Sequence, residues 1–180
     1  MRPSWLIDAE RVDVAVYAAI AATPTPALDR EMRALTSAAD HSKLWLATAG
    51  LLAAAGGRRG RAAATTGLAC VAVTSAAANL VFKPLGRRRR PDPAVLNVPA
   101  ARLVKMPATT SFPSGHAASA FAFATGVGHV LPHQAPAIRA LATLVGYSRV
   151  HTGVHFPGDV LAGSLLGTVL AQMTARALRR

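Results

Sequence analysis

The sequence predicts an all-α integral membrane bundle, with five transmembrane helices and one N-terminal helix in a single domain, residues 1–180. Hydrophobic residues make up 52% of the chain and charged residues only 16%, whereas soluble domains carry about 25% charged residues. The apolar residues fall into separate runs, and arginines stand at the ends of those runs. Apolar runs bounded by charge are typical of helices that cross a bilayer.

The N-terminal segment, residues 1–24, is the least regular part of this expected fold. The charges of residues 4–22 lie all around a helical wheel, so the segment is poorly amphipathic. Only residues 14–22 are continuously apolar, and such a run is too short to span the hydrocarbon core. We expect an interfacial helix or a degenerate sixth span, followed by the catalytic helical bundle of residues 25–178.

The first two spans of the bundle are expected on either side of a basic turn. Residues 62–82 contain no charge across 21 positions, which is enough to cross the hydrocarbon core. Residues 44–57 are also uncharged but form a shorter run. We therefore expect that helix to begin near Leu35 and to enter the membrane obliquely.

Three further spans are expected over residues 116–131, 137–150 and 160–175. In the last of them, Gly163 and Gly167 have the spacing that lets two helices approach closely. We expect this pair to pack within the bundle. The oligomeric state stays open at this level.

Basic residues predict the orientation of these spans. Arginines stand between the first two spans, at the start of the fourth span and after the fifth. If each span crosses the membrane once, these three groups lie on the same side of it. The positive-inside rule makes that side cytoplasmic. Residues 83–115 and 149–159 then lie on the extracytoplasmic face of the plasma membrane. The run from Arg87 to Arg90 conflicts with this orientation, because it places four further arginines on the extracytoplasmic face. Arg87, Arg88 and Arg89 can bind anionic headgroups, and Arg90 is expected to serve a site.

The formal net charge of +12 limits the classes of molecule that the chain is expected to bind. Such a basic balance suits nucleic acid, anionic lipid or a phosphate substrate. Nucleic acid is disfavoured, because few aromatic residues are available to stack bases. The single cysteine, Cys70, lies inside an apolar run, so the chain is expected to form neither an internal disulfide nor a cysteine-based metal site.

Arg149, His155 and Asp159 flank a break between the last two apolar runs. An acid at the edge of a membrane span is costly and usually functional. Asp159 stands four residues after His155 and can accept a hydrogen bond from one ring nitrogen, which leaves the other nitrogen free to attack phosphorus. Asp159 can equally cap the helix that follows it, and the two roles can coexist.

A second group of polar residues opens the third span. Ser114 and Gly115 stand where free backbone amides bind an anion readily, although capping explains the serine equally well. His116 follows in the first turn, where it could protonate a departing oxygen. Lys83, Arg90 and Arg149 supply fixed cations that suit phosphoryl oxygens and stabilise the transition state of phosphoryl transfer.

Together these residues form three motifs. They are Lys83, six residues, then Arg90-Pro91; Pro113-Ser114-Gly115-His116; and Ser148-Arg149, five residues, His155, three residues, Asp159. In this pattern the chain resembles the type 2 phosphatidic acid phosphatase superfamily, which also includes vanadium haloperoxidases. The layout of the expected spans resembles that family over residues 25–178.

The resemblance implies a role for each residue. His155 would be the nucleophile that forms phosphohistidine, Asp159 would orient it, and His116 would be the general acid for the leaving group. The phosphate would be bound by Lys83, Arg90, Ser114, Gly115 and Arg149. The resemblance implies no metal and no cofactor, and it implies a six-helix core. His151, close to the site in sequence, is a further candidate for contact with the substrate.

We therefore expect a metal-independent phosphatase that acts on a lipid phosphate, with a polyprenyl-linked substrate such as decaprenylphosphoryl-5-phosphoribose preferred. Undecaprenyl or decaprenyl diphosphate, phosphatidic acid and phosphatidylglycerol phosphate stay open, because lipid selectivity resides in the shape of the binding groove. A vanadate-dependent haloperoxidase would use the same oxyanion-binding residues, but those enzymes are larger and soluble. A non-catalytic cationic membrane scaffold is the alternative from another class, and it would need no histidine pair.

Overall fold

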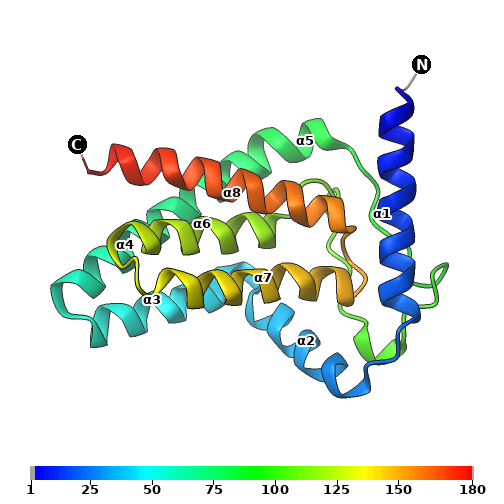
Figure 1. The fold of residues 1–180 in the computed structure, drawn as a ribbon, viewed down its shortest axis with the longest axis horizontal. Coiled ribbons are helices and arrows are strands. Elements are labelled where there is room, and N and C mark those ends of the chain that lie inside the picture. Colours follow the sequence, from blue (N-terminus) through cyan, green and yellow to red (C-terminus); the bar gives the residue numbers. More distant parts are fainter. Residues whose placement is uncertain (1–2, 180) are drawn as a thin grey trace.

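Five helices lie side by side along the long axis of the molecule in a computed structural model that describes residues 3–179 (Figure 1). They are α3 (Lys43–Ala55), α4 (Gly57–Ala77), α6 (Gly115–Val130), α7 (Ala135–His151) and α8 (Pro157–Ala177). Residues 3–179 contain no β-strand, so the predicted all-α class is confirmed.

The remaining helices gather at one end of this bundle. Helix α1 (Ser4–Ala22) stands across that end, transverse to the bundle helices (Figure 1). Helix α2 (Pro26–Ala38) follows it and packs against α7. A π-helical turn, η2 (Ala78–Phe82), and the short α5 (Lys83–Gly86) extend α4 toward the same end. The 3₁₀ turns η1 (Asp40–Ser42) and η3 (Ala100–Arg102) complete the described helical elements.

Helix α6 is the central helix, because it packs against α4, α7 and α8. Its buried side chains are mostly alanines, and small side chains let neighbouring backbones approach closely. Phe123 is the large exception. It lies fully buried against Trp45 of α3, with ring centroids 5.3 Å apart, and so fills the space between α3 and α6.

Helix α8 carries small residues on its inner face and large apolar residues on its outer face. Gly163, Gly167, Ala171 and Ala175 are buried at successive four-residue steps. The outer stripe also follows four-residue steps and consists of Leu161, Leu165, Val169 and Met173, of which Leu161 is 71% exposed. Because lipid tails are as apolar as leucine, membrane helices pack through small residues and turn larger ones outward. The expected packing of Gly163 and Gly167 within the bundle is confirmed.

Two helical stretches of the described chain are long and apolar enough to cross a membrane by themselves. They are Gly57–Gly86, of 30 residues, and Pro157–Ala177, of 21 residues. Helices α3, α6 and α7 have 13, 16 and 17 residues. Each of the five expected spans corresponds to a bundle helix, but within residues 3–179 only two helices have the length and hydropathy of a complete span. The count of five membrane crossings stays a prediction.

The predicted start of the first span near Leu35 is wrong. Leu35 lies inside α2, which ends at Ala38, and α3 begins only at Lys43. Between them His41 and Ser42 adopt φ values of 54° and 60°, which non-glycine residues rarely do. These two left-handed residues turn the chain, so α2 and α3 are separate helices.

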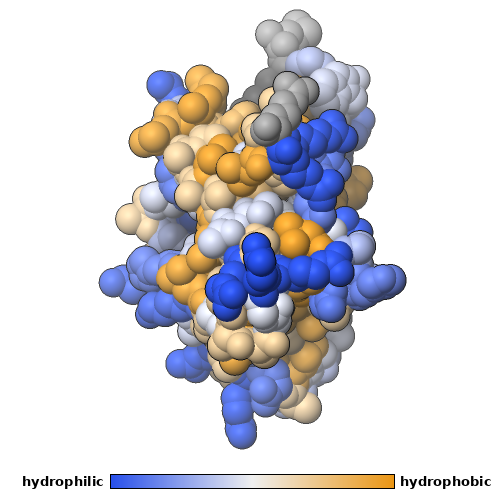
Figure 2. All heavy atoms as spheres, turned by 90° about the vertical axis from the view of Figure 1, so that its left-hand side faces the viewer, coloured by the Kyte–Doolittle hydropathy of each residue, from blue (hydrophilic) through white to orange (hydrophobic). Residues whose placement is uncertain are grey.

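The two ends of the bundle differ in chemistry. The α3–α4 turn, the α6–α7 turn and the C-terminal end of α8 lie together at one end (Figure 1), where hydrophilic side chains gather (Figure 2). The arginines of these segments are Arg58, Arg59, Arg139, Arg176 and Arg179. The loops at residues 87–114 and 152–156 lie at the opposite end with α1 (Figure 1). The basic turns and the predicted site segments are thus separated by the length of the bundle.

Close packing of α8 on α6 leads to a stability prediction. A Cβ atom on Gly167 would overlap the backbone oxygen of Ala118, so Gly167→Ala should force the helices apart. We expect the variant to lose about 1–3 kcal/mol of stability, as overpacked cores do, and to melt at a lower temperature in detergent.

The matched control for this measurement is Gly50→Ala in α3. A Cβ atom there meets nothing within 4 Å, and alanine favours the helix by up to about 1 kcal/mol. Its melting temperature should equal or exceed that of the wild type. Equal melting of wild type and Gly167→Ala would contradict the close α6–α8 contact.

Candidate active site

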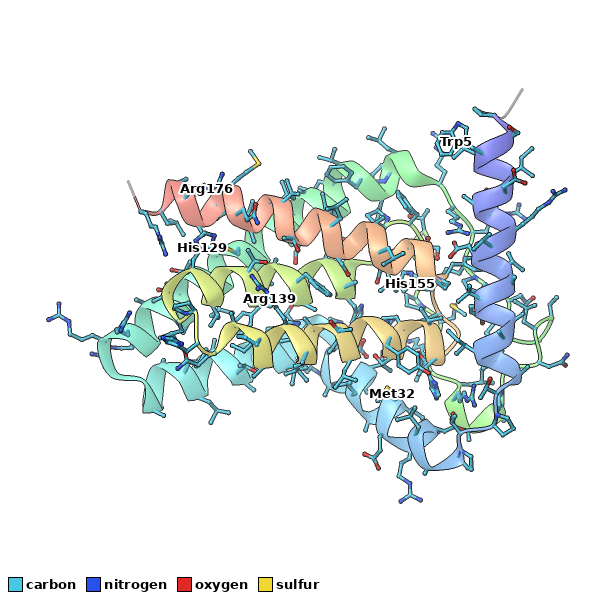
Figure 3. All side chains as sticks on the ribbon, viewed as in Figure 1. Trp5, Met32, His129, Arg139, His155 and Arg176 are labelled. Carbon is cyan, nitrogen blue, oxygen red and sulfur yellow. The ribbon has the colours of Figure 1, made fainter. Side chains whose placement is uncertain are left out.

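Side chains from the three motifs meet at the end of the bundle that α1 crosses. His155 lies there, between the end of α7 and the start of α8 (Figure 3). Two contacts join the motifs directly. Arg90 Nη1 of the first motif lies 3.1 Å from His155 Nε2 of the third, and Ser114 N of the second donates to the backbone oxygen of Asp159 at 2.9 Å. Within the first motif, the Thr109 hydroxyl oxygen links Lys83 Nζ and Arg90 Nη2, both at 3.2 Å.

The contacts of His155 identify its tautomer. Its Nε2 lies 3.1 Å from Arg90 Nη1. A guanidinium group only donates hydrogen bonds, so Nε2 must carry the lone pair and Nδ1 the proton. Nδ1 faces Asp159 Oδ2 at 3.5 Å and Ser111 Oγ at 3.4 Å. The nitrogen with the lone pair therefore points toward the cationic side of the site.

His155 is held in its neutral form. Burial, together with the nearby Arg90 and Arg149, lowers the pKa of His155 to about 4 against the opposing effect of Asp159. A neutral imidazole has a free lone pair and is competent to attack an electrophile. The buried histidine therefore keeps this form throughout the neutral pH range.

Asp159 is fully buried, and both of its carboxylate oxygens have partners. Oδ2 accepts hydrogen bonds from Ser111 Oγ at 2.5 Å and from Phe156 N at 2.9 Å. Oδ1 accepts one from Arg88 Nη1 at 2.9 Å. The bond from Phe156 caps the first turn of α8, so helix capping and contact with His155 coexist in one side chain.

Arg90 is fixed by backbone oxygens from two loops. Its Nε donates to Thr109 O and its Nη1 to Val154 O, both at 2.8 Å, and its Nη2 donates to Thr110 O at 3.2 Å. Lys83 lies beside the backbone of Gly115, since a Cβ atom built there would be 3.7 Å from Nζ. Lys83 therefore borders the N-terminus of α6, where free amides favour an anion, and Thr109 links Lys83 to Arg90.

Arg149 completes the cation cluster, which we define as Lys83, Arg90 and Arg149. It is only 2% exposed, and its Nη1 donates to Thr36 Oγ1. Its Nε is buried without a hydrogen-bond partner, which costs about 1–3 kcal/mol. A guanidinium fork matches the geometry of phosphate oxygens, and a bound phosphoryl oxygen would satisfy this donor.

His116 is paired with a carboxylate that the sequence analysis did not single out. His116 Nε2 lies 2.8 Å from Asp40 Oδ1, and because a carboxylate accepts hydrogen bonds, Nε2 carries a proton. Asp40 also lies 3.9 Å from Arg149 Nη1. Asp40 therefore fixes the ring of His116 at the edge of the cation cluster and leaves Nδ1 available for proton transfer.

Arg88 is a second residue whose position was not anticipated. Its Nη1 lies 2.9 Å from Asp159 Oδ1 and 2.6 Å from Asp13 Oδ2, and its guanidinium lies 4.2 Å from the centre of the Phe156 ring. The interpretation of Arg88 as a headgroup-binding residue is therefore wrong, because the side chain forms internal ion pairs. A signal was available in the sequence, namely its position inside the first motif.

His151 does not join this site. It is 1% exposed and its Nε2 lies 2.9 Å from Asp29 Oδ1. Arg102 donates to the same oxygen at 2.8 Å and also to the backbone oxygens of Ile20 and Thr23. His151 thus belongs to a buried cluster that closes the corner between α1 and α2, and the suggested contact with substrate is wrong.

No part of residues 3–179 groups three or more histidine, cysteine, aspartate or glutamate side chains as metal ligands. The donors that converge on the site are instead cationic or neutral: the cation cluster, the amides at the start of α6 and two histidines. Such a set suits a phosphoryl group.

The sequence profile of the PAP2 superfamily matches residues 63–180. The chain belongs to the PAP2 superfamily. It is 35% identical to the decaprenylphosphoryl-5-phosphoribose phosphatase of Mycobacterium tuberculosis over 165 residues, which cover 90% of this chain and 88% of that protein. The family resemblance seen in the three motifs is confirmed, and this PAP2 chain is a phosphoric ester hydrolase.

Solved PAP2 structures share the fold. LpxE of Aquifex aeolicus superposes with a TM-score of 0.71 at 24% identity, covering 92% of this chain and 95% of that one. The transmembrane PAP2-type phosphatidylglycerolphosphate phosphatase of Bacillus subtilis gives a TM-score of 0.67 at 26% identity, with 96% and 87% covered. The helical arrangement is therefore that of membrane PAP2 proteins.

The lowered pKa of His155 leads to a direct test. In the folded protein His155 should take up its proton only as the pH falls to about 4, whereas an exposed histidine titrates near 6.5. The measurement is a ¹⁵N NMR titration of histidine-labelled protein in detergent, with the signal assigned by its loss in His155→Gln. Titration of that signal near 6.5 would contradict the buried, neutral assignment.

Proposed function

We propose that this PAP2 chain hydrolyses a polyprenyl-linked lipid phosphate, with decaprenylphosphoryl-5-phosphoribose preferred, through a phosphohistidine on His155. The observation that carries the proposal is the arrangement of His155. Its Nε2 lone pair faces Arg90 at 3.1 Å while Nδ1 faces Asp159. This is the arrangement that a histidine nucleophile needs, with one nitrogen oriented by a carboxylate and the other directed at the anion.

The proposed reaction has two steps. In the first, His155 Nε2 attacks phosphorus and the bond from phosphorus to the leaving oxygen breaks. His116, in its imidazolium form with Nε2 paired to Asp40, gives its Nδ1 proton to that oxygen. In the second, a water molecule attacks the phosphohistidine and gives a proton to His116. Inorganic phosphate leaves, and the electron pair of the broken N–P bond returns to Nε2.

The cation cluster supplies electrostatic stabilisation in both steps. Lys83, Arg90 and Arg149 would surround the phosphoryl oxygens, and the unpartnered Nε of Arg149 would bind one of them. Gly115 would add its backbone amide at the N-terminus of α6, and Ser114 would add its hydroxyl group, because the Ser114 amide is already bonded to Asp159 O. In phosphoryl transfer, fixed positive charge around the equatorial oxygens is the main contribution of the protein.

Similarity to the mycobacterial protein supports the preferred substrate, because it extends over nine tenths of this chain. Undecaprenyl or decaprenyl diphosphate, phosphatidic acid and phosphatidylglycerol phosphate are the alternative substrates of the same site. A cationic scaffold without catalysis would need neither the oriented tautomer of His155 nor the proton on His116.

The proposed setting is the plasma membrane, with the five bundle helices crossing it and the site at the extracytoplasmic face. The outward stripe of α8 supports the crossing. The arginines at the end remote from His155 support the orientation, because cytoplasmic turns carry an excess of basic residues. In this setting α1, transverse to the bundle (Figure 1), would lie along the interface.

The catalytic proposal is tested by phosphate release from protein in detergent. We expect the highest kcat/KM for a polyprenyl phosphosugar in a panel with polyprenyl diphosphate and phosphatidic acid, and a rate unaffected by chelator. His155→Ala should lower kcat by about a thousandfold or more, as loss of a nucleophile does, and should abolish an acid-labile phosphoenzyme.

The matched control for that variant is His133→Ala, an exposed histidine in the α6–α7 turn, which should keep wild-type activity. Phosphate release that survives His155→Ala would exclude the phosphohistidine. Lipid binding without any phosphate release would favour the scaffold.

Orientation is tested by labelling single cysteines with a membrane-impermeant maleimide in intact cells, in a Cys70→Ala background. Val95→Cys, at a site-end position that is 72% exposed, should react. Arg59→Cys, exposed in the opposite turn, should react only after the cells are opened. The reverse pattern would place the site in the cytoplasm.

A further inference from the structure

Helix α1 contributes a carboxylate to the support of the candidate nucleophile. We propose that Asp13 is a positioning residue, which acts through Arg88 on Asp159 and so on His155. The inference rests on the proposed function, because it assigns a role relative to the phosphohistidine mechanism. It makes the N-terminal helix part of the active site.

The carboxylate of Asp13 makes two contacts, one with Arg88 and one with the start of α8. Its Oδ2 lies 2.6 Å from Arg88 Nη1, and its Oδ1 accepts a hydrogen bond from Gly158 N at 2.6 Å. Gly158 directly precedes Asp159 in the chain. Asp13 therefore holds both the backbone next to Asp159 and the cation that pairs with it, and its side chain is only 10% exposed.

Arg88 transmits this contact, because a single nitrogen serves both carboxylates. Nη1 lies 2.6 Å from Asp13 Oδ2 and 2.9 Å from Asp159 Oδ1. The guanidinium also lies over the Phe156 ring at 4.2 Å, which limits its movement. Asp13 thus shares the positive charge of Arg88 and prevents it from pairing with Asp159 alone.

The consequence for His155 follows from electrostatics. A carboxylate that is fully paired with a guanidinium is a weaker hydrogen-bond acceptor for the imidazole Nδ1 proton. By sharing Arg88, Asp13 leaves Asp159 with more negative charge to orient His155 and to stabilise the positive charge that develops on its ring. Loss of Asp13 and loss of Arg88 should therefore act on His155 in opposite directions.

A second acid on α1 shows that this contact is specific to Asp13. Asp8 pairs with Arg11 at 3.5 Å, but those side chains are 66% and 77% exposed, and such exposed pairs contribute little. Asp13 instead faces inward. This explains why the charges of α1 lie on several faces, since one of them is turned to the site.

The other charged groups around His155 stay the same in the test. Arg90, Arg149 and His116 interact with its imidazole from the loop, α7 and α6, and none of them contacts Asp13. The test therefore changes only the Asp13–Arg88–Asp159 contacts and leaves these three groups in place.

The test compares Asp13→Asn with Arg88→Gln. An asparagine can still accept from Gly158 N, so α1 should stay in place while the charge is lost. We expect kcat to fall about tenfold with little change in KM, as for loss of a charge-assisted contact, and the ¹⁵N titration of His155 to move to lower pH. Arg88→Gln should move that titration to higher pH by about half a unit or more.

Asp8→Asn is the matched control on the same helix and should leave kcat and the titration unchanged. Melting temperatures in detergent separate folding from positioning, and if Asp13→Asn does not fold, the same downward shift is expected in Asp13→Ser, a second uncharged variant. The role of Asp13 would be overturned if the two substitutions shifted the His155 titration in the same direction or not at all. In that case activity would follow only the melting temperature of each variant. A wild-type protein that forms no phosphoenzyme would overturn the proposed function instead, and this role with it.

Discussion

The buried carboxylate of Asp159 is the constraint on which the rest of the site depends. A charge removed from water must be paired and hydrogen-bonded, and Asp159 has no exposed surface. Its partners are Arg88 and Ser111, from the two ends of the loop at residues 87–114, and the backbone nitrogen of Phe156 at the start of α8. Satisfying one acid therefore fixes the loop, the helix start and, through Asp13, the position of α1.

The cation cluster poses the opposite electrostatic problem, because Lys83 and Arg90 lie near the buried Arg149 and the three positive charges repel one another. Backbone oxygens hold Arg90, and a hydroxyl group holds Arg149. These neutral acceptors orient the guanidinium groups, while the Asp40 carboxylate lies farther away, 3.9 Å from Arg149 Nη1, and Nε of Arg149 stays unpaired. The protein thus stores positive potential next to a neutral histidine, which is what an incoming phosphate dianion needs.

Helix packing and the site are coupled through small residues. Gly163 of α8 lies against the backbone oxygen of Ser114, where a Cβ atom would overlap it. Ser114 is the N-cap of α6 and donates its amide to Asp159 O. The same close approach that suits helices in lipid therefore brings the second and third motifs into hydrogen-bonding distance.

What the sequence by itself determined was local: the apolar runs, the caps at Ser114 and Asp159, and the contact of His155 with an acid one helical turn later. Each depends on residues within a few positions of one another. The tertiary structure alone decided the pairs Asp40–His116, Thr36–Arg149 and Asp13–Arg88, and the left-handed break at His41 and Ser42, where no glycine or proline marks a turn. These features depend on how the helices pack, because residues far apart in the chain meet only when several helices are placed at once.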